Sequence, residues 1–195
     1  MSKKGFLIII TAPSGAGKTT IYKRILKEMP WIRYSVSFTT RKPRPGEKDG
    51  VDYHFVDRKK FMEMVNRGEF VEWAEVHGEY YGTEKSQIDR ILKNGDVCIL
   101  DVDVKGALNL MNLYDNFVSI FIEPPSFAEL ERRLRKRGTE DSDRIRTRLE
   151  RAKKELESKK FFDYIVINDT LDRAVDEIKG IIESKLKERL NASNL

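Results

Sequence analysis

Residues 6–20 read Phe6-Leu7-Ile8-Ile9-Ile10-Thr11-Ala12-Pro13-Ser14-Gly15-Ala16-Gly17-Lys18-Thr19-Thr20. They begin with a continuous apolar run rich in isoleucine, which is typical of a strand buried on both faces of a parallel sheet. Beyond the glycines, Ile21, Ile25 and Met29 recur every four residues and predict a helix over residues 19–29. A glycine-rich turn between a buried strand and a helix is the setting of a phosphate-binding loop.

The turn also has the chemistry that such a loop requires. Gly15 and Gly17 let backbone N–H groups point inward, and the following helix N-terminus adds positive partial charge. We expect Lys18 to reach the β- and γ-phosphates of ATP and the Thr19 hydroxyl to bind Mg²⁺. The motif departs from its usual form at Ala12, where glycine is usual; alanine fits there if its φ stays negative. The predicted ATP-binding loop comprises Ala12, Pro13, Ser14, Gly15, Ala16, Gly17, Lys18, Thr19 and Thr20.

Apolar runs alternate with helical patterns further along the chain. Buried strands are predicted over residues 97–102, 117–122 and 164–167. Helices are predicted over residues 104–113, 126–137, 143–160 and 171–190. Ser126 and Glu129 have the spacing of a capping box, which we expect at the start of one of these helices. The alternation predicts an α/β fold of the P-loop NTPase type, with a parallel sheet and helices on both of its faces.

An acidic residue follows one of the predicted strands. Asp101 ends the apolar run of residues 97–100, so it should emerge at the carboxyl edge of the sheet, where α/β proteins bind ligands. An aspartate in this place is often only a helix cap. Because a phosphate-binding loop lies nearby, we expect Asp101 to coordinate Mg²⁺, either directly or through a water molecule.

The segment from residue 35 to 84 departs from the alternation of buried strands and helices. It contains strand-like stretches over residues 34–40 and 70–77 and a short helical pattern over residues 58–67. We interpret it as a mixed α/β lobe inserted into one unit that spans residues 1–195. The core then comprises residues 1–34, 85–125 and 160–190, and a helical lid region comprises residues 126–159.

Composition narrows the class of protein. The 195 residues are 39% hydrophobic and 35% charged, enough for a real core and a strongly solvated surface. The single cysteine, Cys98, excludes an internal disulfide, fits a reducing compartment and lies in an apolar run, so we expect it to be buried. The net charge of +5 suits polyphosphates as well as nucleic acid, but no nucleic-acid motif occurs. No segment has the length of a membrane span.

The inserted lobe has the residues to bind a phosphorylated acceptor. Arg41 and Arg44 lie in a loop stiffened by prolines, and guanidinium groups match phosphate oxygens in geometry. Tyr53 and Tyr81 could add hydroxyl donors. A solvated basic loop would contain the same arginines, so these residues alone leave both interpretations open.

Recognition of a guanine base would need a different set of groups. A carboxylate can accept from the N1 and N2 donors of guanine, and a hydroxyl can donate to O6. Adenine leaves such a site with unpaired polar groups and is strongly rejected. Glu72, Ser37 and Thr83 offer these groups, although the residues by themselves leave their convergence open.

Several motifs in order resemble the guanylate kinase family over nearly the whole chain. They are Ser35-Val36-Ser37-Phe38-Thr39-Thr40-Arg41-Lys42-Pro43-Arg44, Asp52-Tyr53-His54-Phe55, Glu69-Phe70-Val71-Glu72-Trp73-Ala74, Tyr80-Tyr81-Gly82-Thr83, Ile99-Leu100-Asp101-Val102-Asp103, Arg137-Gly138-Thr139-Glu140 and Ile167-Asn168-Asp169. The resemblance implies that the GMP phosphate is held by Arg41, Arg44, Tyr53 and Tyr81. It implies that the guanine is read by Glu72, Ser37, Thr83 and Asp103, and that Asn168 contacts the adenine of ATP.

The helices after residue 126 present regularly spaced arginines. Arg133 and Arg137 are four residues apart and therefore share a helix face, followed by Gly138. An ordinary helix surface with salt bridges would show the same spacing of arginines. The resemblance instead makes Arg133, Arg137 and Arg148 the arginines of a mobile lid over the moving phosphoryl group. The predicted catalytic set is Lys18, Arg41, Asp101, Arg133, Arg137 and Arg148.

Together these features predict a cytoplasmic guanylate kinase that uses Mg²⁺ and moves the γ-phosphoryl group of ATP to GMP, and to dGMP as well. We expect no nucleic acid or membrane partner, and the sequence leaves monomer and dimer open. One alternative is a kinase of the same architecture with another phosphorylated acceptor. A second is a guanylate-kinase-like binding domain without catalysis. Such domains characteristically degrade the phosphate-binding loop or the nucleotide contacts, whereas Gly17, Lys18 and Thr19 are present here.

Overall fold

The computed structural model describes residues 5–76, 78–136 and 142–192. In this part of the chain, five strands form one parallel sheet in the order β2-β7-β1-β8-β9. These strands are β1 (Phe6–Thr11), β2 (Arg33–Tyr34), β7 (Val97–Asp101), β8 (Phe117–Glu123) and β9 (Tyr164–Ile167). The fold is therefore α/β with a parallel core sheet, as the alternating pattern predicts.

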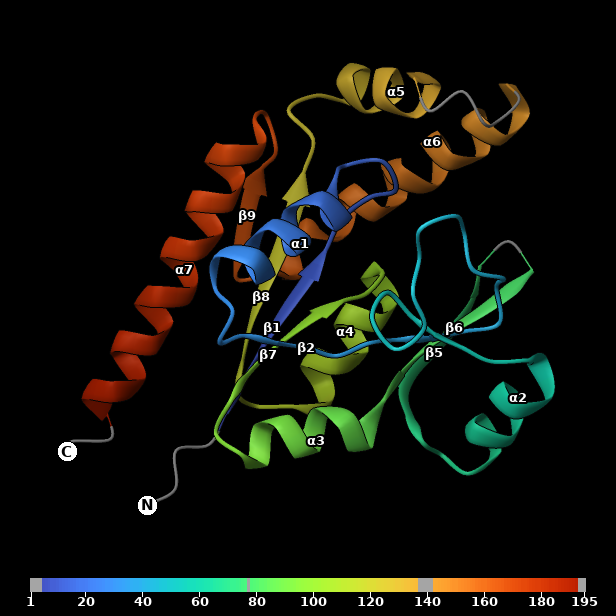
Figure 1. Ribbon diagram of the computed structural model, residues 1–195. Coiled ribbons are helices and arrows are strands. Elements are labelled where there is room, and N and C mark those ends of the chain that lie inside the picture. Colours follow the sequence, from blue (N-terminus) through green and yellow to red (C-terminus); the bar gives the residue numbers. More distant parts are fainter. Residues whose placement is uncertain (1–4, 77, 137–141, 193–195) are drawn as a thin grey trace.

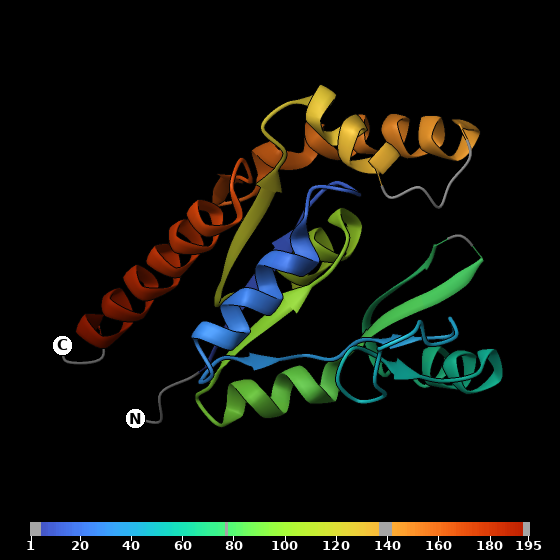
Figure 2. The same ribbon diagram turned by 45° about the horizontal axis from the view of Figure 1, so that its top comes forward.

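Helices cover both faces of this sheet because its central strand is apolar on both sides. Phe6, Ile8 and Ile10 pack with one helical layer, while Leu7 and Ile9 pack with the other. The first layer contains α1 (Lys18–Glu28) and α7 (Leu171–Ala192), which lie side by side in Figures 1 and 2. The second contains α3 (Lys85–Lys93) and α4 (Val104–Leu113). Cys98 is fully buried in that second layer, as expected.

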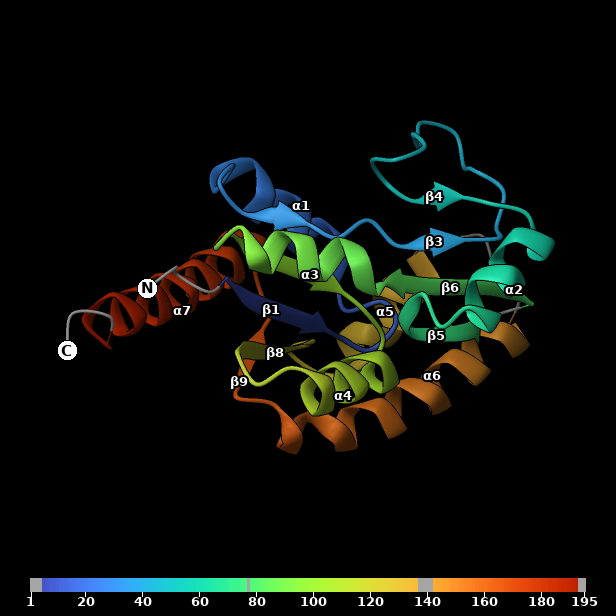
Figure 3. The same ribbon diagram turned by 90° about the horizontal axis from the view of Figure 1, so that it is seen from below.

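A second sheet lies beside the core. In the described residues its strand order is β4-β3-β6-β5, with β3–β4 parallel and the other pairs antiparallel. The strands are β3 (Phe38–Thr39), β4 (His54–Phe55), β5 (Phe70–Val76) and β6 (Glu79–Glu84), and α2 (Arg58–Asn66) packs nearby. Figure 3 shows α2 and this sheet at the opposite end of the molecule from α7.

The remaining helices are α5 (Phe127–Lys136), α6 (Ser142–Glu157) and a short 3-10 turn, η1 (Ser158–Phe161). Leu130 and Leu134 of α5 pack on Ala152 and Leu149 of α6, so this pair has a small core of its own. Both helices lie above the loop between β1 and α1 in Figure 2, and in Figure 1 α5 lies above it while α6 passes behind it. Among the described residues, no helix combines the length and hydropathy that crossing a bilayer requires.

Some predictions of local structure were wrong. The stretch over residues 34–40 is not one strand, because Tyr34 ends β2 in the core sheet and Phe38 begins β3 in the second sheet. β9 is not buried throughout, because it is the edge strand and both Ile165 and Ile167 are exposed. The capping box is half formed: Glu129 N donates to Ser126 Oγ at 3.1 Å, but the Glu129 carboxylate pairs with arginines instead.

Candidate functional site

A continuous cleft runs between the two sheets and past the loop that follows β1. One end is lined by Ser37, Glu72 and Tyr81. We call it the acceptor-side end, because these residues were predicted to bind the acceptor. The middle is lined by residues 12–15 and 17–20. The far end reaches Asn168 between α1 and α5. Neighbouring parts share lining residues, so the three parts adjoin one another. The predicted residues that line it are Ala12, Pro13, Ser14, Gly15, Gly17, Lys18, Thr19, Thr20, Ser37, Tyr53, Glu72, Tyr81, Asp101, Asp103, Arg133, Arg148 and Asn168.

The loop between β1 and α1 is built around two glycines in the left-handed region. Gly15 and Gly17 both have φ of 95°, a conformation that other residues adopt only at a cost. A Cβ on Gly15 would meet Leu134 Cδ2 at 2.8 Å, so α5 lies directly on the loop. Ala16 is fully buried beneath, and its carbonyl accepts from Asn168 Nδ2 at 2.6 Å. The Asn168 amide nitrogen thus supports the loop in addition to facing the cleft.

Gly17 offers a test of this packing. A Cβ at Gly17 would lie 2.5 Å from Asn168 Nδ2, in addition to the positive φ. We expect Gly17→Ala to lower the free energy of unfolding by about 2–4 kcal/mol in urea denaturation. Gly68→Ala is the matched control, since Gly68 has φ +66° and no atom within 4 Å of an added Cβ. It should lose only about 1 kcal/mol. Equal losses in the two variants would contradict the role given to Asn168.

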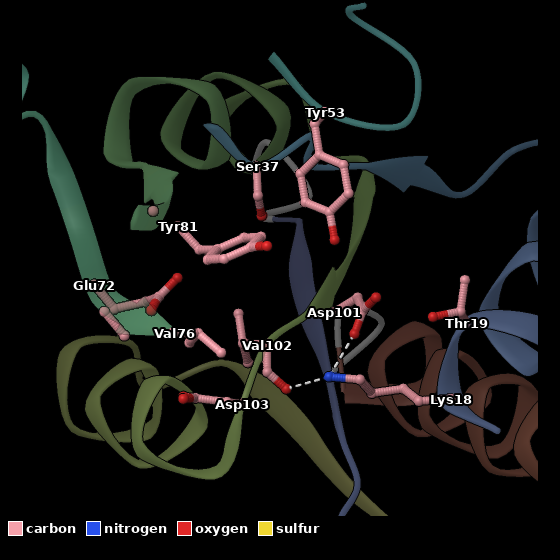
Figure 4. Close-up of a pocket in the computed structure, with 12 residues that line it drawn as sticks. Lys18, Thr19, Ser37, Tyr53, Glu72, Val76, Tyr81, Asp101, Val102 and Asp103 are labelled. Carbon is pink, nitrogen blue, oxygen red and sulfur yellow. Dashed lines mark hydrogen bonds and ion pairs between the residues drawn. The ribbon is translucent and has the colours of Figure 1, made fainter. Parts of the chain in front are cut away.

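Lys18 and Asp101 form an ion pair at the centre of the cleft. Lys18 Nζ lies 2.6 Å from Asp101 Oδ1 and donates to the Val102 carbonyl, also at 2.6 Å (Figure 4). Thr11 Oγ1 donates to the same carbonyl at 3.0 Å, which fixes the end of β7 against β1. The Asp101 side chain is only 10% exposed, so the lysine offsets a charge that water barely reaches.

The side-chain oxygens near Lys18 are suitable ligands for a hard cation. The Thr19 hydroxyl and the Asp101 carboxylate line the same part of the cleft, beside the loop that would hold phosphates. Mg²⁺ prefers oxygen ligands and is commonly held by one or two protein groups together with nucleotide phosphates. The donor set therefore fits Mg²⁺ carried by a nucleotide.

Four polar side chains meet on the acceptor-side wall. Thr83 Oγ1 donates to Glu72 Oε1 at 2.5 Å, and Ser37 Oγ lies 3.5 Å from Thr83 Oγ1. Asp103 caps α4 by accepting from Gly106 N at 2.8 Å. The convergence of Ser37, Glu72 and Thr83, which the residues alone leave open, is present in the structure. Figure 4 shows Glu72 and Tyr81 across the cavity from Lys18.

The Glu72 carboxyl lies in an electrostatically unfavourable place. Its pKa is raised from 4.5 to about 7, mainly by burial and also by the charge of Asp103. The hydrogen bond from Thr83 and the charge of Lys18 act in the opposite direction. A ligand that donates hydrogen bonds to this carboxyl would favour its ionised form.

The raised pKa predicts how stability depends on pH. Glu72 binds its proton more tightly in the folded chain, so its contribution is full below pH 4.5 and is lost as pH rises through about 7. The loss is at most about 3 kcal/mol. Glu72→Gln should therefore be about 1–3 kcal/mol more stable than the parent protein at pH 8.5, with a smaller difference at pH 5. Urea denaturation without ligands measures this, and a less stable variant at pH 8.5 would contradict it.

The predicted phosphate-binding residues of the lobe differ in their surroundings. Tyr53 lines the cleft, and burial raises the pKa of its hydroxyl to about 12, so it stays a donor at neutral pH. Arg41 lies over the Tyr53 ring and forms a double hydrogen bond with Glu47 at 2.9 and 3.0 Å. Arg44 is exposed and its backbone N donates to Glu47. A carboxylate thus occupies the Arg41 fork where the resemblance implies a phosphate.

The arginines of α5 and α6 already contact the loop. Arg148 donates to Ser14 Oγ, with its Nη2 at 2.7 Å. Arg133 donates to the Asn168 carbonyl at 2.9 Å and to the Ala16 carbonyl at 3.4 Å. Glu129 also pairs with Arg133. Arg137 lies outside the described residues.

The cleft includes residues that were not predicted from the sequence. Thr147, Arg151 and Glu155 line its middle beside Arg148, and Lys136 lines its far end beside Asn168. Arg148, Arg151 and Glu155 are three and four residues apart, so they share one face of α6. That spacing was visible in the sequence, but it also describes an ordinary salt-bridged helix.

Comparisons with known proteins agree with this geometry. The family described as guanylate kinase matches residues 4–185. Guanylate kinases of Geobacter metallireducens and Thermotoga maritima are each 47% identical over 182 residues, covering 93% of this chain and 90% and 88% of those proteins. A guanylate kinase crystal structure from Anaplasma phagocytophilum superposes with a TM-score of 0.78 at 32% identity, covering 94% of this chain and 87% of that one.

A more distant structure shares the fold alone. It is a shikimate kinase from Bacteroides thetaiotaomicron, with a TM-score of 0.50 at 16% identity over 91% of this chain and 98% of that one. The family match and the 47% identical relatives extend over nearly the whole chain. This chain therefore belongs to the guanylate kinase family of nucleoside monophosphate kinases.

Proposed function

We propose that this protein transfers the γ-phosphoryl group of Mg²⁺-bound ATP to GMP, and to dGMP, giving ADP and GDP or dGDP. One observation carries the proposal: a phosphate-binding loop and a wall of guanine-complementary groups face each other across one cleft, with Lys18 and Asp101 between them. The names of the relatives support the same reaction. In this proposal the protein works in the cytoplasm, where both nucleotides are made and used.

The donor nucleotide would occupy the middle and far end of the cleft. Backbone N–H groups of the loop and the N-terminus of α1 would hold its phosphates. Its adenine would lie near Asn168, beside Thr20 and Arg133. Thr19 would ligate Mg²⁺ and Asp101 would reach it through water; the ion would supply positive charge that offsets the charge of the phosphates.

The acceptor would lie against the second sheet. Glu72 would accept from the N1 and N2 donors of guanine, helped at N2 by Asp103, while Ser37 and Thr83 would lie near O6. Tyr53, Tyr81, Arg41 and Arg44 would hold the acceptor phosphate. Arg41 would exchange its contact with Glu47 for that phosphate, which carries more charge.

Transfer in this arrangement requires positioning and charge stabilisation but no general base. An oxygen of the GMP phosphate is already ionised near neutral pH. It attacks the γ-phosphorus, and the new O–P bond forms as the bond to the β–γ bridging oxygen breaks. Lys18 would leave its contacts with Asp101 and Val102 to neutralise charge on the moving group. Arg133, Arg137 and Arg148 would close over it and exclude water.

The products of the reaction test this proposal. The protein is incubated with Mg²⁺, ATP and GMP, and the nucleotides are separated by anion-exchange chromatography. ADP and GDP should appear in equal amounts, with at least about 10³-fold less ADP when GMP is omitted. ADP without GDP would indicate an ATPase. A folded protein that binds GMP but forms neither product would be a binding domain of this fold.

A further inference from the structure

Arg151 connects helix α6 to the acceptor-side wall of the cleft. Its Nη2 lies 3.4 Å from Asp103 Oδ2, and its Nε donates to Glu155 Oε1 at 2.8 Å. The Glu155 side chain is only 13% exposed, whereas that of Arg151 is 45% exposed. A well-buried carboxylate therefore holds the Nε of the guanidinium, and Nη2 reaches toward Asp103.

Asp103 has one oxygen fixed by the backbone and one that faces Arg151. Its Oδ1 accepts from Gly106 N at 2.8 Å, while its Oδ2 is the atom near Arg151. A Cβ placed on Gly106 would lie 2.8 Å from Glu72 Oε2 and 3.3 Å from Asp103 Oδ1. Two carboxylates thus lie close together at the start of α4, where their charges repel each other.

The same helix also reaches the ATP-binding loop. Arg148 donates to Ser14 Oγ, and Arg151 lies three residues further along the same face of α6. Both arginines line the middle of the cleft with Asp103. Helix α6 therefore contacts the ATP-binding loop through one arginine and the acceptor-side wall through the other.

We propose that Arg151 is a positioning residue for the acceptor, which orients Asp103 beside Glu72 and ties that orientation to the position of α6. The inference rests on the proposed function, because it concerns how the acceptor base is held. Asp103 would then meet the exocyclic amine of the base in a fixed geometry. Loss of Arg151 would leave the Asp103 carboxylate held only through Oδ1, by Gly106 N, and would weaken acceptor binding without removing any group from the phosphoryl transfer itself.

Steady-state kinetics can separate this role from a structural one. In Arg151→Ala, KM for GMP should rise about 5–20-fold, while kcat and KM for ATP should stay within about twofold. Arg151→Lys should recover part of the loss because it restores the positive charge. Lys154→Ala is the control, since Lys154 is an exposed cation on the same helix. Its KM for GMP should equal that of the parent protein.

A double-mutant cycle tests whether Arg151 acts through Asp103. Asp103→Asn alone should raise KM for GMP, and adding Arg151→Ala should raise it by less than twofold more. An unchanged KM in Arg151→Ala, or a full additional loss in the Asp103→Asn background, would overturn the inference. So would an equal loss in Lys154→Ala. Absence of GMP turnover in the parent protein would instead overturn the proposed function, so the two failures are distinguishable.

Discussion

Replacing Lys18 with methionine should lower kcat for phosphoryl transfer about 10³-fold or more. The charge that develops on the moving group has to be stabilised by groups already in place, and removal of one such donor typically has an effect of this size. Lys18 lies between the loop that follows β1 and the wall that contains Glu72, and its Nζ is 2.6 Å from Asp101 Oδ1. The measurement is single-turnover transfer from ATP to GMP at saturating nucleotide concentrations.

The Lys18 variant needs a control for folding, because it leaves Asp101 without its cation. Asp101 is 10% exposed, so Lys18→Met should also lower the melting temperature. Adding Asp101→Asn should restore the melting temperature but not the turnover. Lys27→Met, at an exposed position of the same helix, should change neither quantity. A folded Lys18→Met protein with kcat near that of the parent would remove the proposed mechanism.

Replacing Glu72 with glutamine should lower kcat/KM for GMP about 10²–10³-fold while leaving the affinity for ATP within about twofold. The amide would place a donor against the N1 and N2 donors of guanine, and a buried donor without an acceptor is unfavourable. Glu75→Gln is the matched control, since Glu75 is an exposed carboxylate on the same strand. Equal losses for GMP and ATP in Glu72→Gln would contradict the role of Glu72 in reading the base.

The same carboxyl should make GMP binding depend on pH. Only its ionised form can accept both guanine donors, and without ligand its pKa is about 7. KM for GMP should therefore rise as pH falls from 8 to 6, approaching about tenfold per pH unit well below 7. KM for ATP over the same range gives the comparison. The dependence should flatten in Glu72→Gln, and an unchanged slope in that variant would count against Glu72 as the titrating group.

The core of the fold could be predicted because its signals are local. The apolar run of β1, the glycines after it and the helical spacing of α1 are adjacent in sequence, and the structure has them within a residue of the predicted bounds. The second sheet was harder to predict because β3 and β4 span two residues each and are stabilised by partners far along the chain. Helix α3 and strand β6 were not predicted either.

The candidate site could also be predicted only in part. Residue types and motifs identify Lys18, Asp101 and Glu72 as candidate site residues. The groups that each of them contacts are determined by the tertiary structure. The ion pair of Lys18 with Asp101 joins residues on α1 and β7, and the raised pKa of Glu72 depends on burial that no sequence pattern measures. The contact between Arg151 and Asp103 likewise joins positions 48 residues apart.

The most direct test of the proposed function compares acceptors under identical conditions. ADP release is coupled to a spectroscopic readout with Mg²⁺ and ATP, and kcat/KM is determined for GMP, dGMP, AMP, CMP, UMP and a sugar phosphate. We predict efficient turnover with GMP and dGMP and at least about 10⁴-fold lower kcat/KM with AMP, since adenine would leave the Glu72 site unpaired. Turnover with the sugar phosphate or AMP that equals or exceeds turnover with GMP would contradict this account.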